Sequence, residues 1–379
     1  MLFKQLSEYF AQLEATTLRN KMTEILASLF KEAEASEIGK LCYLLQGRVA
    51  PLFEAVEFGL ADKMMIRAIT QGLGVEDGLV LKVFKEEGDL GKAVEKLKLA
   101  ESGKRKASRK VHIMDVYEVL YKVATSGGSG SQDLKIKLLG DLLHDVDSLS
   151  ARYIVKITLA KLRMGFSDMT ILDSLSWMLH CTKEARPEIE RAYNVRPDLG
   201  FISETVKKKG IEGLKNVEPT VGTPILMARA ERMTNAEDII DKIGECAIEP
   251  KFDGFRLQVH YQRKAESGKR KEREELIKLI SRNLEDVTHM YPDIVEGVRM
   301  EIKVKEAIFE GEAIGINLKT GAYLPFQETV QRKRKYDIET MAQKIPLKLI
   351  AFDLLYLDGE NLINKPYRER RKRLEEIVS

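Results

Sequence analysis

The residues with the clearest chemical potential are Lys251, Asp253, Gly254 and Arg256, which follow one another as Lys-x-Asp-Gly-x-Arg. A lysine amine becomes a nucleophile when its neutral form is available, and burial or a neighbouring cation favours that form. Asp-Gly between alternating strands predicts a tight β-hairpin, because Gly adopts the positive φ that the turn requires. The stretch is therefore either an ordinary β-turn with a surface lysine or a turn that presents a nucleophile.

Later segments place polar side chains where strands are expected to end. Residues 281–286 follow an apolar run, Glu310 and Glu312 alternate with apolar residues, and Phe352 and Asp353 lie in the most apolar strand. An Asp in such a strand is costly unless it is paired or faces a cleft. Each segment also has a structural interpretation, namely a helix N-cap, the solvent side of an edge strand and core packing of Phe352.

The elements that must position these residues differ between the two halves of the chain. Residues 1 to about 213 show apolar side chains at helical spacing and no strand alternation, which predicts one all-helical domain. Apolar residues at helical spacing over residues 3–13 and 22–30 predict the first two helices. Further helices are expected at 36–46, 51–57, 60–72, 76–85, 90–99, 111–124, 131–145, 148–163, 167–180, 183–193 and 198–209.

Near residue 210 the composition changes, since Gly and Pro cluster over residues 210–224. Beyond this boundary the pattern predicts a mixed α+β domain. Its expected strands are 247–248 with 255–261 as the hairpin, 276–282, 307–317, 323–325 and 347–356, with a turn at 357–360. Its expected helices are 236–243, 284–300, 326–336 and 367–378.

Short turns that contain glycine or basic residues lead into several of the expected helices. Free amides at a helix N-terminus bind phosphate, and glycine permits close approach, although helix capping explains any single turn equally well. A run of basic residues without an acid at 103–110 adds a candidate phosphate contact. The candidate nucleic-acid residues are Arg48, Gly88, Gly91, Lys104, Arg105, Lys106, Gly127, Gly128 and Gly165.

Composition narrows the class of protein further. The 379 residues allow two or three domains, and the net charge of +3 is too small to identify a partner by itself. Cys42, Cys181 and Cys246 lack the spacing of a disulfide framework or a zinc site, which is typical of a reducing compartment. No apolar run approaches the ~20 residues of a membrane span, so we expect a cytoplasmic protein without membrane contact; the family resemblance described next implies association with the nucleoid.

Taken together, these segments resemble the covalent nucleotidyltransferases, and among them the ATP-dependent DNA ligases of archaeal type. The nucleotide-attachment motif of that family is similar to residues 251–256, and its later motifs are similar to residues 281–286, to Glu312 in Glu-Gly-Glu-Ala and to residues 351–356. The helical half is similar to the DNA-binding domain of these ligases, notably at residues 43–48 and 192–200. The resemblance covers nearly the whole chain.

The resemblance implies a role for each motif residue. Lys251 is the catalytic nucleophile that attacks the α-phosphate of ATP. Glu249 bonds the adenine amino group, Phe352 stacks on the base, Arg256 contacts the ribose or the phosphate at the nick, Glu312 holds the ribose or a metal (Mg²⁺ or Mn²⁺), and Arg282 contacts phosphate. AMP then passes to a 5′-phosphate at a nick, and the 3′-hydroxyl seals the strand.

The expected fold is thus an all-α DNA-binding domain at 1–213 and a partial α+β nucleotidyltransferase domain, antiparallel and ATP-grasp-like, at 214–379. The family continues with further adenylation motifs and an OB-fold domain that this chain lacks, so we expect a fragment with impaired catalysis. The expected partner is nicked double-stranded DNA, with a sliding clamp as a further partner of a monomeric protein. The alternatives are an RNA ligase or capping-type nucleotidyltransferase and a non-catalytic DNA-binding fragment.

Overall fold

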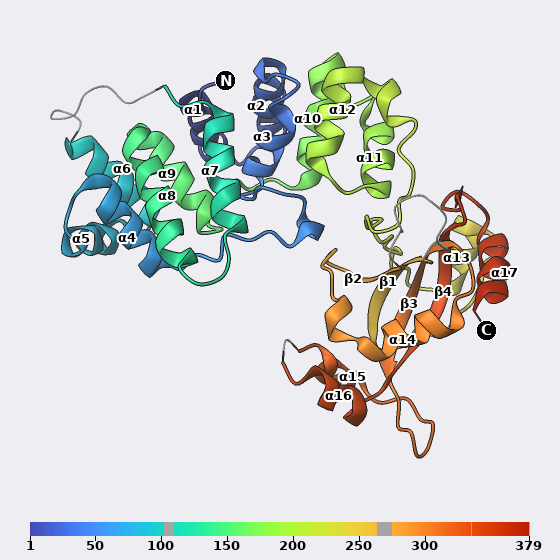
Figure 1. The fold of residues 1–379 in the computed structure, drawn as a ribbon. Coiled ribbons are helices and arrows are strands. Elements are labelled where there is room, and N and C mark those ends of the chain that lie inside the picture. The colour runs from blue at the N-terminus through green and yellow to red at the C-terminus, as the bar shows by residue number, and fades with distance from the viewer. Residues whose placement is uncertain (102–109, 264–274, 335, 379) are drawn as a thin grey trace, which may run out of the picture. The chain divides into compact units, whose positions relative to one another are not determined.

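The computed structural model describes residues 1–101, 110–263, 275–334 and 336–378 (Figure 1). The chain divides into two compact units. The helical unit comprises Met1–Tyr193 and Pro197–Val217, and the sheet unit comprises Asn194–Arg196 and Glu218–Ser379. The predicted assignment of 1–213 and 214–379 to two functional domains stays a prediction.

In the helical unit, long helices alternate with short turns, as the apolar periodicity predicts. Its helices are α1 (Phe3–Glu14), α2 (Arg19–Glu32), α3 (Ile38–Leu45), α4 (Asp62–Leu73), α5 (Asp77–Glu87), α6 (Leu90–Glu101), α7 (Ile113–Thr125), α8 (Ser131–Asp145), α9 (Ser148–Thr158), α10 (Asp168–His180), α11 (Arg186–Val195) and α12 (Leu199–Lys209). They pack as the pairs α4 with α8, α6 with α9, α2 with α10 and α3 with α12. Fully buried residues such as Phe10, Leu26 and Ile154 form the core.

Two of the predicted helices are wrong in extent. Residues 51–57 form only a 3-10 turn (Leu52–Glu54), because Ala55 adopts a left-handed conformation with φ of 52°. The helix predicted to run to residue 163 ends at Thr158, since Ala160 has φ of 55°. A left-handed residue reverses the chain direction and cannot continue an α-helix.

The sheet unit is built on a five-stranded antiparallel sheet in the order β2-β1-β3-β4-β5. The strands are β1 (Phe255–Gln262), β2 (Leu276–Ser281), β3 (Glu306–Gly315), β4 (Leu347–Leu357) and β5 (Glu360–Asn361). Its helices are α13 (Ala236–Ile243), α14 (Pro292–Glu301), α15 (Phe326–Thr329), α16 (Ile338–Lys344) and α17 (Tyr367–Ile377). Leu257, Val259 and Phe309 share one sheet face and pack in one core with Ile294 and Val298 of α14.

The predicted hairpin at Asp253-Gly254 is wrong. Residues 245–254 form no strand, and β1 pairs with β2 and β3. Gly254 does not have a positive φ, and a Cβ on it would lie 2.2 Å from the carbonyl oxygen of Ala313 in β3. The glycine is therefore required by the close approach of the loop to β3, not by a turn.

Other predictions in the sheet unit fail where a local signal was misread. Residues 284–291 do not continue a helix, because Leu284 is left-handed and Asp286 pairs with Ile280, and α14 starts at Pro292. The helix predicted over 326–336 ends as a 3-10 turn at Arg332, and α16 was missed. Asp358-Gly359 does form the predicted turn, with both residues at positive φ between β4 and β5.

We predict that Gly254→Ala destabilises the sheet unit. The added Cβ must displace β3 backbone, at a cost of about 1–3 kcal/mol or more. Calorimetric unfolding should show a lower Tm for the transition of this unit. Gly297→Ala in α14 is the matched control, because a Cβ there meets no atom within 4 Å. Equal Tm values for the two variants would contradict the close-approach argument.

Candidate nucleotide site

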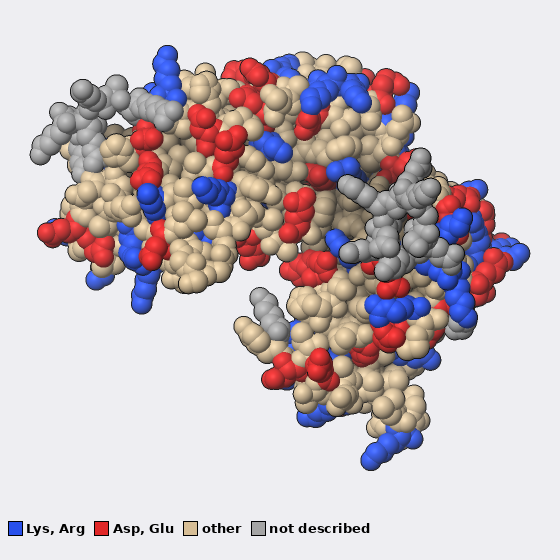
Figure 2. Space-filling model, viewed as in Figure 1, with Lys and Arg blue, Asp and Glu red and all other residues tan. Residues whose placement is uncertain are grey.

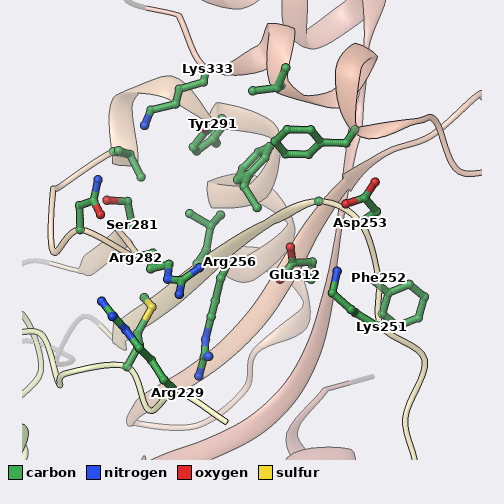
Figure 3. A pocket seen from close by; sticks show the side chains of 18 of the residues that line it. Arg229, Lys251, Phe252, Asp253, Arg256, Ser281, Arg282, Tyr291, Glu312 and Lys333 are labelled. Carbon is green, nitrogen blue, oxygen red and sulfur yellow. The ribbon is translucent and has the colours of Figure 1, made fainter. Parts of the chain in front are cut away.

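A cavity of about 610 Å³ lies at the start of β1 in the sheet unit (Figure 3). The loop before β1 contributes Lys251 and Asp253, β1 contributes Arg256, the β2 end contributes Arg282, and β3 contributes Glu312. The register explains the gathering, because Arg256 lies opposite Glu312 in the antiparallel pair β1–β3. Four of the predicted site residues thus line one cavity: Lys251, Arg256, Arg282 and Glu312.

Glu312 is the carboxylate at the centre of this group. It is half-buried and accepts a hydrogen bond from the backbone of Gly254. Burial raises the pKa of Glu312, although the Gly254 hydrogen bond and the charges of Arg256 and Lys251 oppose the rise. Lys251 itself is exposed to solvent at the cavity. A lysine amine and a partly desolvated carboxylate thus lie within electrostatic range of each other.

Arg256 is held by the sheet as well as facing the cavity. Its guanidinium forms an ion pair with Glu310, which is 2% exposed, and donates to the Ala228 carbonyl at 3.1 Å. It also lies over the Phe352 ring at 5.2 Å. Glu310 is therefore buried, and it lies on a central strand of the sheet. The interpretation that it forms the solvent side of an edge strand is wrong.

Glu249 and Phe352 are not among the residues that line this cavity. Glu249 is exposed, accepts a hydrogen bond from the Tyr367 hydroxyl at 2.5 Å and lies 3.9 Å from Arg371. The backbone carbonyl of Phe352 accepts from the same hydroxyl at 3.1 Å. Tyr367 of α17 thereby ties the two predicted base-contacting residues to each other.

Asp353 and Arg332 both form ion pairs within the sheet unit. Asp353 is paired, as an acid in an apolar strand must be, with Arg370 at 2.7 and 3.1 Å. Arg332 is buried and donates to Asp293 at 2.5 Å, so it does not face solvent. Lys333, next to it, does line the cavity.

Sequence reasoning missed several cavity residues, of which Arg229 is the most polar. Arg229 comes from the segment before α13, and Figure 3 shows it near Arg256 and Arg282. Tyr291 and Met227 also line the cavity. A cation in an irregular segment gives no periodic signal, so the sequence offered no means of finding Arg229.

Two family models match the chain. The model described as "DNA ligase N terminus" matches residues 2–176, and the model described as "ATP dependent DNA ligase domain" matches residues 227–379. The chain belongs to the ATP-dependent DNA ligase family. The resemblance inferred from the motifs is thereby confirmed, and so is the ATP dependence of the family.

Curated relatives align with the whole length of this ligase-family chain. A "Probable DNA ligase" of Dictyoglomus turgidum is 44% identical over 100% of this chain and 62% of its own length. A "DNA ligase" of Staphylothermus marinus is 40% identical over 100% of this chain and 64% of its own length. Among solved structures, the ligase domain of M. tuberculosis LigD is 30% identical over 34% of this chain and 35% of its own, with a TM-score of 0.24. The chain thus spans somewhat less than two thirds of the length of these curated relatives.

The candidate nucleic-acid residues of this ligase-family chain are dispersed over the helical unit. Gly127, Gly128 and Gly165 lie in exposed turns, and Gly88 ends α5 at φ of 68°. Gly91 is buried, and a Cβ on it would lie 2.8 Å from the carbonyl oxygen of Arg152 in α9. Its small size therefore serves helix packing.

The remaining candidates are basic. Arg48 is half-buried and lies within electrostatic range of Tyr193. Lys104, Arg105 and Lys106 lie outside the described residues. On the face drawn in Figure 2, basic side chains are interspersed with acidic ones, in keeping with the net charge of +3.

Neither a cluster of metal ligands nor a membrane-spanning helix is found in the described part of the chain. Within those residues, no cluster of three or more His, Cys, Asp or Glu side chains could hold a metal ion. No described helix is long and apolar enough to cross a membrane.

We predict a pH-dependent stability that originates at His260 of β1. Burial is the main cause that lowers the pKa of His260 from the ordinary histidine value of 6.5 to about 3. Between these values the unfolded chain binds the proton and the folded chain does not, so stability falls as the pH falls from 6.5 towards 3. Chemical denaturation of wild type and His260→Gln at several pH values in this range measures the free energy of unfolding. This free energy should fall more steeply with falling pH in wild type than in His260→Gln. Parallel curves would contradict the neutral, buried state of His260.

Proposed function

We propose that this chain supplies the DNA-binding and adenylation steps of an ATP-dependent DNA ligase that seals nicks in duplex DNA. Residues 1–213 bind the duplex, and residues 214–379 carry the nucleotide chemistry. The observation that supports this most directly is the gathering of Lys251, Glu312 and the cations Arg229, Arg282 and Lys333 at one cavity in a chain of this family.

In the adenylation step, the neutral amine of Lys251 attacks the α-phosphate of ATP. A nitrogen–phosphorus bond forms as the bond to pyrophosphate breaks, and the amine gives up its proton. Arg282 and Lys333, at the same cavity, would stabilise the charge on the departing phosphates. AMP then passes from Lys251 to a 5′-phosphate, and attack by the 3′-hydroxyl at the nick closes the strand and releases AMP.

Binding of the adenosine part falls to the side chains at the start of the sheet. Glu249 would bond the adenine amino group, Phe352 would stack on the base, and Arg256 would contact the ribose or the nick phosphate. Arg256 over the Phe352 ring at 5.2 Å supports a shared subsite for the two.

The two carboxylates that line the cavity, Asp253 and Glu312, are of the kind that binds a divalent metal. Mg²⁺ is commonly held by one or two carboxylates together with substrate phosphates, and Glu312 lies within electrostatic range of Asp253. Bound there, Mg²⁺ or Mn²⁺ would neutralise phosphate charge. Glu312 would serve as its protein ligand. A monomeric state, a nucleoid location and contact with a sliding clamp stay predictions.

We predict that incubation with ATP labelled at the α-phosphate and Mg²⁺ transfers label to the chain through Lys251. Lys251→Ala should abolish the labelling, because no other group replaces the amine. Lys344→Ala, which removes an exposed lysine of α16, should retain it. Acid-labile label on a gel is the measurement.

The outcomes of this test separate the alternatives. Label that survives Lys251→Ala would overturn the assignment of the nucleophile. Labelling by GTP in place of ATP would favour a capping-type enzyme, and binding of nicked duplex with no labelling at all would favour a non-catalytic DNA-binding fragment.

We also predict that nicked duplex DNA binds with a steep dependence on salt. Replacing Lys104, Arg105 and Lys106 together by Gln should lower the slope of log affinity against log salt by about 2–3, since each phosphate contact contributes about 0.9. Fluorescence anisotropy of a labelled nicked duplex measures the slope. Replacement of three exposed lysines of α4 and α5 (Lys63, Lys82 and Lys85) is the control for net charge. An equal fall in both variants would contradict a specific role for the 104–106 run.

A further inference from the structure

A ladder of polar side chains runs along one face of β1, on the side of the sheet that carries Glu312. Arg256, Gln258 and His260 alternate along the strand and therefore share this face. Gln258 and His260 are fully buried, and Gln258 lies opposite Glu310 in β3. Buried polar groups of this kind must each find a partner.

Their partners lie in residues 222–228, the irregular segment that precedes α13. The Gly222 amide donates to Nδ1 of His260 at 3.1 Å. The Ile225 amide donates to Oε1 of Gln258 at 2.8 Å, and Nε2 of Gln258 donates to the Ile225 carbonyl at 3.0 Å. The Ala228 carbonyl accepts from Arg256 at 3.1 Å. Three successive rungs of the ladder thus hold three points of this segment.

The rungs are also bonded to one another. Nε2 of His260 and Oε1 of Gln258 are 2.9 Å apart, and Nε2 of Gln258 donates to Glu310 at 2.9 Å. Glu310 in turn forms the ion pair with Arg256. Because Gln258 contacts His260, Glu310 and Ile225, its loss would disconnect the segment from the ladder at its centre.

The segment held in this way continues directly into the cavity. Met227, Ala228, Arg229 and Ala230 all line it. Within the described part of the chain, no ion pair is formed by Arg229, Arg282 or Lys333. Arg256, by contrast, is neutralised by Glu310. A polyanion that enters the cavity would therefore meet the charge of Arg229 undiminished.

We propose that Gln258 is a positioning residue that clamps residues 222–230 to the sheet, and that the clamped segment presents Arg229 as a contact for the polyphosphate of the nucleotide. The nucleotide part of this inference rests on the proposed adenylation function. The clamp itself does not, because it is a statement about the hydrogen bonds of Ile225 and Gly222.

Gln258→Met and Gln262→Met make a matched pair in the full 379-residue chain. Both replace a glutamine on the same face of β1 by an apolar side chain of similar length. Gln262, however, donates to Glu306 at 2.5 Å, and its side chain forms no hydrogen bond with the segment among the described residues. Hydrogen exchange followed by mass spectrometry should show faster exchange over residues 222–230 in Gln258→Met, and wild-type exchange there in Gln262→Met.

Labelling with α-labelled ATP supplies the second readout. Gln258→Met should raise the ATP concentration for half-maximal labelling roughly tenfold, because Arg229 is no longer held at the cavity, and should leave the maximal rate nearly unchanged. Arg229→Ala, an exposed change that leaves the core intact, should raise the same concentration without any effect on exchange in β1. Arg229→Lys should restore much of the affinity, because the charge is retained.

Each contrary result has its own meaning. Unchanged exchange over 222–230 in Gln258→Met would overturn the clamp. Faster exchange in that variant with unchanged ATP dependence in both Gln258→Met and Arg229→Ala would overturn the nucleotide role of the segment. A wild-type chain that takes up no label would overturn the proposed function and the role of Arg229 with it, while the exchange data would still decide the clamp.

Discussion

The arrangement of the sheet unit depends on one buried charge, the carboxylate of Glu310. It lies in a central strand, and an unpaired carboxylate there would cost several kcal/mol. The sheet meets this requirement by placing Gln258 opposite it and Arg256 beside it. Because Glu310 binds these two side chains, they must lie on the same face of the sheet as the carboxylate. Glu312 and the cavity lie on that face as well.

The second constraint is steric and acts at Gly254. The loop that carries Lys251 approaches β3 so closely that only a hydrogen fits between Gly254 and the Ala313 carbonyl. This contact lets the backbone of Gly254 reach Glu312 and brings the lysine within electrostatic range of that carboxylate. The Asp-Gly pair is therefore part of the site because of tertiary packing, although its composition is that of a hairpin turn.

These two constraints explain which features the sequence could predict. Periodicity is a property of each segment by itself, so the helices of the first half and the apolar strand β4 could be predicted from it. The Asp358-Gly359 turn was also predictable, because both neighbours are strands that pair with each other. Asp253-Gly254 carries the same dipeptide, but its preceding residues have no partner strand, and no local pattern reveals that. The motif residues were found through family resemblance, whereas Arg229 and the buried state of Arg332 depend on contacts with distant segments.

The same contacts distinguish one cation of the cavity, which is ion-paired, from the others, which are not ion-paired within the described residues. Arg256 is bonded to Glu310 and to the Ala228 carbonyl, so its guanidinium is held in place and its charge is largely cancelled. Such a group is well suited to orient a neutral partner, such as an aromatic base on Phe352 or a ribose hydroxyl. Arg229, Arg282 and Lys333 come from three irregular segments around the same cavity and keep their charge for an anion. The cavity thus has an ion-paired arginine and the Glu312 carboxylate on the sheet, and cationic side chains on the surrounding loops.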